Sequence, residues 1–114
     1  MTLAERSCLP CQGQIEKLSA ADRDALLKKV PAWRFCTEGA DGIEYLTRTF
    51  AFTEYRQAVD FTCRVAELAE AENHHPRLVL EWGQVTVDWW THTVGGLYIN
   101  DFILAARCDK LYGE

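Results

Sequence analysis

The sequence predicts an α+β protein in two layers, with a four-stranded antiparallel sheet and helices packed on one face of it. Two observations lead to this fold class. Segments with the apolar spacing of helices alternate with pairs of short strand-like segments, in the order α-ββ-α-ββ-α. The strands of each pair are separated by a few turn-forming residues, which is typical of antiparallel hairpins. With 114 residues, the chain has the size of one domain.

The N-terminal segment, residues 1–17, shows no clear period and is predicted to be an arm that precedes a single folded domain over residues 18–114. Its Cys8 and Cys11 form a CxxC, which supplies two of the four ligands that a structural zinc site needs. The five cysteines of the chain are expected to be reduced thiols. A redox or metal role for the CxxC is the alternative.

The first half of the domain is predicted to form a helix and a hairpin. A helix is expected over residues 19–30, because Ser19 can cap its first turn and Pro31 prevents its continuation. Residues 33–36 and 43–52 are predicted strands, and the glycine-containing segment between them indicates a turn.

The strongest helical pattern covers residues 53–73. Thr53 can cap this helix, and Asn73 together with Pro76 ends it. We expect the helix to bury one row of side chains, which begins at Tyr55 and continues through Val59, Cys63, Ala66 and either Ala69 or Glu70.

A second hairpin is predicted from residues 77–82 and 84–92, with its turn at Gly83. Side chains alternate along the second strand, so that one face carries Val85, Val87 and Trp89, and the other carries Thr86, Asp88, Trp90 and His92. A closing helix is expected over residues 98–113, because apolar side chains recur there at helical spacing.

Charge and hydropathy argue against several classes of function. The net charge is −5, whereas a nucleic-acid surface needs an excess of Lys and Arg to neutralise phosphates. No apolar run approaches the ~18 residues of a membrane span, and the first residues lack the apolar core of a secretion signal. We therefore expect no nucleic-acid partner, no membrane association and a cytoplasmic location.

The three histidines of the chain are spaced so that they can meet. His74 and His75 follow the central helix, and Glu70 lies one helical turn before His74. If the turn at Gly83 is tight, the second strand returns beside the start of the first and brings His92 next to the histidine pair. Imidazoles titrate near pH ~6.5 and suit acid–base catalysis. Two alternatives stay open: a three-histidine metal site, and structural or surface histidines.

Two motifs carry a resemblance to a known family. "E-x-x-x-H-H-P" at residues 70–76 and "T-H-x-x-x-G-L-x-x-x-D" at residues 91–101 resemble those of pterin-4a-carbinolamine dehydratases of the bacterial type, and the likeness extends over nearly the whole chain. The resemblance implies dehydration of 4a-hydroxytetrahydropterin to the quinonoid dihydropterin, which recycles the cofactor of aromatic amino acid hydroxylases. It also implies a homodimer or homotetramer, a possible functional link to such a hydroxylase, and no metal or organic cofactor.

The resemblance also implies roles for single residues. His74 and His92 would transfer protons, and His75 would hold and polarise the pterin. Glu70 could orient an imidazole, and Asp101 is as suited to cap the last helix as to touch the ligand. The substrate-binding positions implied by the family pattern are Glu70, Pro76, Thr91, Thr93, Val94 and Asp101.

Two further expectations concern the tryptophans and a second class of function. Trp82, Trp89 and Trp90 could stack on a pterin ring, although core packing is expected for two of them. The alternative to catalysis is a dimerisation or coactivator-type binding module on the same fold, as some relatives of this family have lost catalysis.

Overall fold

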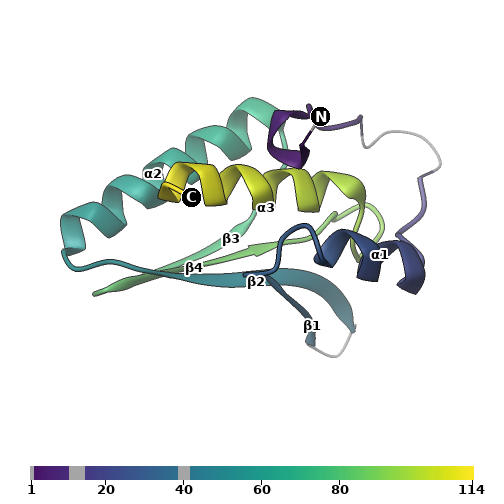
Figure 1. Cartoon of the computed structure of the whole chain (residues 1–114), viewed down its shortest axis with the longest axis horizontal. Coiled ribbons are helices and arrows are strands. Elements are labelled where there is room, and N and C mark those ends of the chain that lie inside the picture. The colour runs from purple at the N-terminus through teal and green to yellow at the C-terminus, as the bar shows by residue number, and fades with distance from the viewer. Residues whose placement is uncertain (1, 11–14, 39–41) are drawn as a thin grey trace.

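The computed structural model describes residues 2–10, 15–38 and 42–114 (Figure 1). The predicted α+β class and the predicted order of elements are confirmed. A short 3-10 helix, η1, precedes them. The elements are η1 (Leu3–Glu5), α1 (Ala20–Leu27), β1 (Arg34–Glu38), β2 (Ile43–Ala51), α2 (Tyr55–Glu72), β3 (Arg77–Glu81), β4 (Gln84–Trp89) and α3 (Ile99–Tyr112).

The four strands form one antiparallel sheet in the order β1-β2-β4-β3. The β3–β4 hairpin turns through Trp82 and Gly83, because Glu81 pairs with Gln84 in the register. Gly83 has a φ of 81°, a conformation that glycine adopts at little cost. This tight turn fixes Arg77 opposite Asp88 at the other end of the hairpin.

Helices α2 and α3 lie together over one face of the sheet (Figure 1). The predicted alternation along β4 places Val85, Val87 and Trp89 on this face, where each is fully buried. An aromatic cluster of Phe50, Phe52, Phe61 and Tyr112 fills the space between β2 and the two helices, with ring centroids 4.7–6.0 Å apart.

The buried side of α2 differs from the predicted one. Its core residues are Ala58, Phe61, Val65 and Ala69, whereas Tyr55, Cys63 and Ala66 are exposed. Both rows have helical spacing, and the larger Phe61 and Val65 side chains fill the space under the helix. Of the expected row, Ala69 alone is buried, while Val59 is half-buried and the other members are exposed.

Several predicted boundaries shift by a few residues. Ser19 caps α1, since its hydroxyl accepts a hydrogen bond from the Asp22 amide at 3.2 Å. Thr53 does not cap α2, because Glu54 occupies the N-cap position and the Thr53 hydroxyl bonds to Gln57 instead. Strand β4 ends at Trp89, so His92 lies in the following loop and not on the strand.

The N-terminal segment packs on the rest of the chain. Leu3 in η1 is buried against the core. The backbone of Leu9 exchanges two hydrogen bonds of 2.7 Å with the side chain of Asn100 in α3. Cys8 is half-buried, and Cys11 lies outside the described residues. The division into an arm and a domain at residue 18 stays a prediction.

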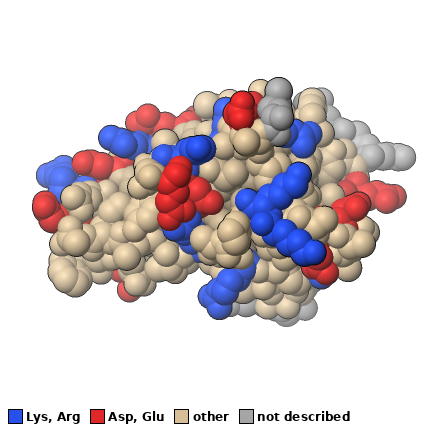
Figure 2. Space-filling view, in the orientation of Figure 1, with Lys and Arg blue, Asp and Glu red and all other residues tan. Residues whose placement is uncertain are grey.

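Charges of both signs are interspersed on the side of the molecule that carries α2 and α3 (Figure 2). Lys and Arg side chains form no continuous basic surface there, in keeping with the net charge of −5. Within the described ranges, no helix combines the length and the apolar character that crossing a bilayer requires.

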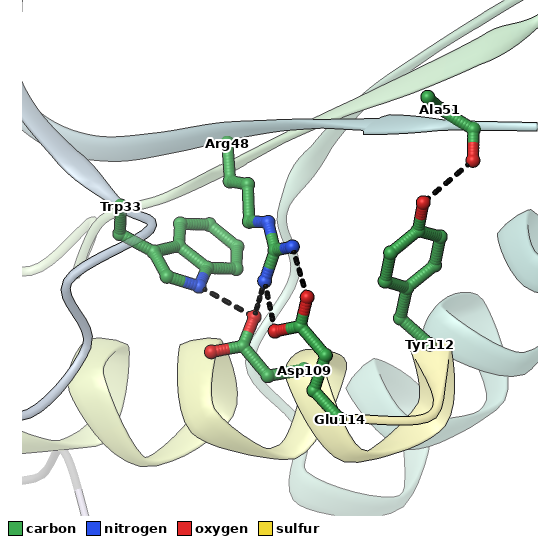
Figure 3. Close-up of polar contacts among 6 residues, drawn as sticks. All are labelled: Trp33, Arg48, Ala51, Asp109, Tyr112 and Glu114. Carbon is green, nitrogen blue, oxygen red and sulfur yellow. Dashed lines mark hydrogen bonds and ion pairs between the residues drawn. The ribbon is translucent and has the colours of Figure 1, made fainter.

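A polar network ties the end of α3 to the sheet (Figure 3). Arg48 extends from β2 and donates hydrogen bonds to Asp109 and to both carboxylate oxygens of Glu114. The indole of Trp33 donates to the same Asp109 oxygen at 2.9 Å. Burial raises the pKa of Asp109, and the hydrogen bond from Arg48 lowers the pKa of Glu114. Arg48 thus compensates two carboxylates at once.

Replacing Arg48 should cost stability at neutral pH. In Arg48→Gln, the half-buried Asp109 loses its cation, and we expect a loss of about 2 kcal/mol in the free energy of unfolding. The contribution of Glu114 to the free energy of unfolding is fully present above the ordinary pKa of a glutamate. It is lost as the pH falls through the lowered pKa that Glu114 has in the folded protein. Urea unfolding should therefore show a smaller gap between the two proteins in acid than at neutral pH. Asp109→Asn keeps an oxygen that can accept from both Trp33 and Arg48, so it should lower the free energy of unfolding less than Arg48→Gln does. An equal loss in the two variants would contradict the charge argument.

Candidate active site

The three histidines line one cavity at the end of the β3–β4 hairpin. Helix α2 ends at Asn73, whose left-handed φ of 51° turns the chain into His74, His75 and Pro76. The Nε2 of His92 donates to the backbone carbonyl of His75 at 3.3 Å. A cavity of about 210 Å³ lies between these segments and is lined by Asn73, His74, His75, Thr91, His92 and Thr93.

His74 is held by the buried carboxylate of Asp101. Its Nε2 lies 2.7 Å from Oδ1 of Asp101, and both residues are shielded from solvent. The other oxygen, Oδ2, accepts the hydroxyl of Thr91 at 2.7 Å and the backbone amide of Tyr98 at 2.9 Å. Asp101 therefore closes the first turn of α3 and fixes His74 at the same time.

Hydrogen bonding determines which ring nitrogen of two histidines can react. A carboxylate and a carbonyl only accept, so the Nε2 atoms of His74 and His92 must carry protons. In the neutral imidazole, Nδ1 then holds the lone pair. Among the described residues, neither Nδ1 atom has a hydrogen-bond partner. Each is free to exchange a proton with a bound molecule.

His75 pairs with Glu70 at the rim of the cavity. Its Nε2 lies 2.9 Å from Oε1 of Glu70, and the two side chains are 57% and 81% exposed. Glu70 therefore contacts His75 and not His74, from which it is separated by one helical turn. A contact as exposed as this contributes little to stability.

Comparison with known proteins bears on what this cavity does. A family model described as pterin 4 alpha carbinolamine dehydratase matches residues 16–111. A Chlorobium limicola protein is 52% identical over 110 residues, which cover 96% of this chain and 96% of that protein. The chain belongs to the pterin-4-alpha-carbinolamine dehydratase family. A Marinobacter nauticus protein is 49% identical over 110 residues, covering 96% of this chain and 97% of that protein. Both names assign the proteins to this family provisionally.

Two solved structures of the family share the fold. One is described as a transcriptional coactivator/pterin dehydratase from Brucella melitensis; it is 26% identical, has a TM-score of 0.75, and aligns with 86% of this chain and all of its own. The other is described as a pterin dehydratase-like protein that is a RuBisCO assembly factor in the alpha-carboxysome. It is 27% identical, has a TM-score of 0.62, and aligns with 73% of this chain and 92% of its own.

The motif residues of this family member do not all reach the cavity. Thr91 and Thr93 line it together with the histidines. Pro76 and Val94 are half-buried beside it, and Asp101 lies behind His74, fully buried. Asp101 belongs to the first turn of α3, one of the two roles considered for it, and its carboxylate is bonded to two residues that line the cavity, His74 and Thr91.

Asn73 lines the cavity, although the sequence indicated it only as a helix end. Its position directly before His74 could have indicated from the sequence that it lies at the site. The tryptophans differ from expectation as well. Trp82 is 78% exposed at the hairpin turn, away from the histidines. Trp89 is fully buried and stacks on His74, with ring centroids 5.8 Å apart.

The histidines do not line the largest cavities of this molecule. A larger cavity of about 490 Å³ lies between η1 and the end of α3, and another of about 460 Å³ lies between α2 and the end of α3. Neither contains an imidazole. We assign the site to the smaller cavity, because convergent titratable groups are better indicators of chemistry than volume. Across the described parts of the chain, no group of three or more His, Cys, Asp or Glu is arranged to hold a metal ion.

Asp101→Asn should reverse the tautomer of His74. In the variant, the asparagine oxygen can still accept the hydrogen bonds from the Thr91 hydroxyl and the Tyr98 amide. The amide NH₂ group then faces His74 and donates to Nε2, which must act as an acceptor. We therefore expect His74 as the Nε2–H tautomer in the unaltered protein and as Nδ1–H in the variant, measured by long-range ¹H–¹⁵N NMR. Thr91→Val should leave the tautomer unchanged. The same tautomer in the unaltered protein and in Asp101→Asn would rule out this role of the carboxylate.

Proposed function

We propose that this chain catalyses the dehydration of a 4a-hydroxytetrahydropterin to the quinonoid dihydropterin and water, and so recycles the pterin cofactor of aromatic amino acid hydroxylases. One observation carries the proposal. In a member of a dehydratase family, three imidazoles surround one cavity, and each of them presents an Nδ1 atom that no described residue binds. The reaction would proceed in the cytoplasm without a metal or organic cofactor.

The chemistry requires one acid and one base. The C4a–O bond breaks as a proton reaches the leaving hydroxyl, which departs as water. The proton on N5 is removed as the C4a=N5 bond forms, so one proton is taken and one is given. Imidazoles serve both purposes near neutral pH. His74 and His92 are the two proton-transfer groups in this proposal. Their Nδ1 atoms are open while Nε2 is engaged, and His75, whose Nε2 faces the exposed Glu70 carboxylate at the rim, is given the binding role.

The remaining residues bind or orient. His75, oriented by Glu70, holds and polarises the pterin at the rim of the cavity. Thr91, Thr93, Pro76 and Val94 shape the cavity wall or its surroundings. Asp101 acts through His74, as its carboxylate is entirely buried.

The test is stopped-flow absorbance of freshly generated 4a-hydroxytetrahydropterin. The unaltered protein should accelerate its decay, and His74→Ala and His92→Ala should each lower kcat by roughly 10²-fold, the usual contribution of a general acid or base. His75→Ala should act mainly on KM. Trp82→Leu, a change at an exposed position far from the cavity, is the matched control. Decay at the uncatalysed rate would refute the proposal, and loss of activity in chelator would favour the metal alternative.

A second candidate function is a non-catalytic binding module. The observation that favours it is the likeness to a protein described as a RuBisCO assembly factor. Against it stand the three histidines and Asp101, which form a complete acid–base constellation here. If the stopped-flow assay shows no catalysis, pull-down of partners with the unaltered chain and with a triple histidine-to-alanine variant would test this alternative.

We also propose that the chain forms a homodimer through β3. Two such dimers would form a homotetramer if they pack together through the exposed α2 residues Tyr55, Cys63 and Ala66. β3 lies at the edge of the sheet, and its sequence RLVLE is self-complementary in antiparallel pairing. Centred on Val79, this pairing sets Arg77 opposite Glu81 of a second copy and Leu78 opposite Leu80. Val79 is 42% exposed on its own chain, and an unpaired edge strand favours such an addition.

Val79→Lys should dissociate this dimer. It would place two lysines directly opposite each other across the two-fold axis, and like charges at such a position destabilise strand pairing. Sedimentation velocity should show an oligomer for the unaltered chain and a monomer for the variant. Thr49→Lys introduces the same charge on the same sheet face of the central strand β2 and should leave the oligomer intact. An oligomer that persists in Val79→Lys would contradict the β3 interface.

A further inference from the structure

A second histidine of the site rests on a tryptophan. The rings of Trp90 and His92 are stacked, with centroids 4.8 Å apart and planes inclined by 20°. Trp90 is half-buried, whereas His92 is exposed. The arrangement repeats that of His74 on Trp89, where the planes are inclined by 22°.

The two stacks lie on opposite faces of the sheet. Trp89 is the last residue of β4 and points into the helix-covered core, so Trp90 turns to the face that the helices leave open. Adjacent tryptophans therefore each support one of the two imidazoles to which the proposed function gives a proton-transfer role.

Trp90 is itself held by charged and aromatic neighbours. Tyr45 meets it edge-on at 6.3 Å, and the Arg77 guanidinium lies 5.5 Å from the Trp90 centroid and 5.3 Å from that of Tyr45. Arg77 in turn donates to Asp88 at 2.8 Å, and Asp88 is only 4% exposed. The position of the indole is thus fixed from the two neighbouring strands, β2 and β3.

We propose that Trp90 is a positioning residue for His92, and that Arg77 and Tyr45 secure it; this inference rests on the proposed function. The only hydrogen bond of the His92 side chain to a described residue is the long contact of 3.3 Å with the His75 carbonyl. A single hydrogen bond leaves the ring free to rotate about the N–H···O axis, and χ2 of histidine is intrinsically broad. The flat face of the indole removes this rotation. It thereby fixes where Nδ1 of His92 points.

The test compares Trp90→Leu, Trp90→Phe and Trp82→Leu in two measurements. In the stopped-flow assay, Trp90→Leu should lower kcat roughly tenfold with KM nearly unchanged, since a misdirected proton-transfer group affects the transition state more than binding. Trp90→Phe, which keeps a flat ring, should restore most of the rate. Trp82→Leu removes an exposed tryptophan at the other end of the hairpin and should match the unaltered protein.

The second measurement does not depend on activity. The carbon-bound ring protons of His92 should be shifted upfield by the indole ring current, and Trp90→Leu should abolish the shift while Trp82→Leu retains it. With three histidines in the chain, His92→Gln assigns the signals. Identical His92 shifts in the unaltered protein and Trp90→Leu would overturn the stack, and an unchanged kcat would overturn its positioning role.

The outcomes also separate this inference from the proposed function. An unaltered protein without dehydratase activity would refute the reaction, while the NMR comparison would still decide whether Trp90 holds His92. If Trp90→Leu does not fold, the double variant Arg77→Gln/Asp88→Asn loosens the indole and leaves no buried charge unpaired. The double variant should move the His92 signals part of the way from their positions in the unaltered protein toward those expected without the ring current. It should also lower kcat by less than the tenfold expected for Trp90→Leu. No change in either measurement would overturn the inference.

Discussion

The arrangement of the site depends on the hydrogen bonds of the buried Asp101 carboxylate. It accepts hydrogen bonds from His74, Thr91 and the Tyr98 amide, and these three groups come from the end of α2, the loop after β4 and the start of α3. A fully buried carboxylate is costly unless donors surround it. The same bonds that satisfy it therefore hold three segments in one arrangement, and the site and the packing of α3 on the sheet are secured by one group.

The β3–β4 hairpin supplies the other constraint. Its two-residue turn fixes the register from Gln84 to Asp88, and the chain beyond that register carries His75 on one side and His92 on the other. Because the turn is tight, the ring of His92 reaches the backbone carbonyl of His75, only 17 residues earlier in the chain. All three histidines lie in short connections, His74 and His75 between α2 and β3 and His92 after β4. The helix and strands that flank these connections give them a more definite geometry than long loops would have.

The opposite end of the sheet is secured differently. Arg48 joins Asp109 and Glu114 there, and the hydroxyl of Tyr112 donates to the Ala51 carbonyl at 2.7 Å (Figure 3). α3 is therefore attached to the sheet by polar contacts at both ends, with apolar packing between them. Cys108, in this middle part, illustrates the dryness of the core, since burial raises the pKa of its thiol to about 12. Its burial makes it a core residue and not a reactive thiol.

The sequence by itself determined the order of elements, both hairpins, the end of α2 at Asn73 and the proximity of the three histidines. Each depends on local chemistry: periodicity, a glycine in a turn, or a left-handed residue before a proline. Tertiary structure alone decided that α2 buries Phe61 and Val65 and not the row of Val59 and Cys63, because two rows of similar spacing compete and the shape of the sheet selects between them. It also decided that Asp101 holds His74 across 27 residues, and that Trp89 and Trp90 support different histidines. Contacts between distant segments depend on how the layers pack, and the pattern of any single segment does not contain that information.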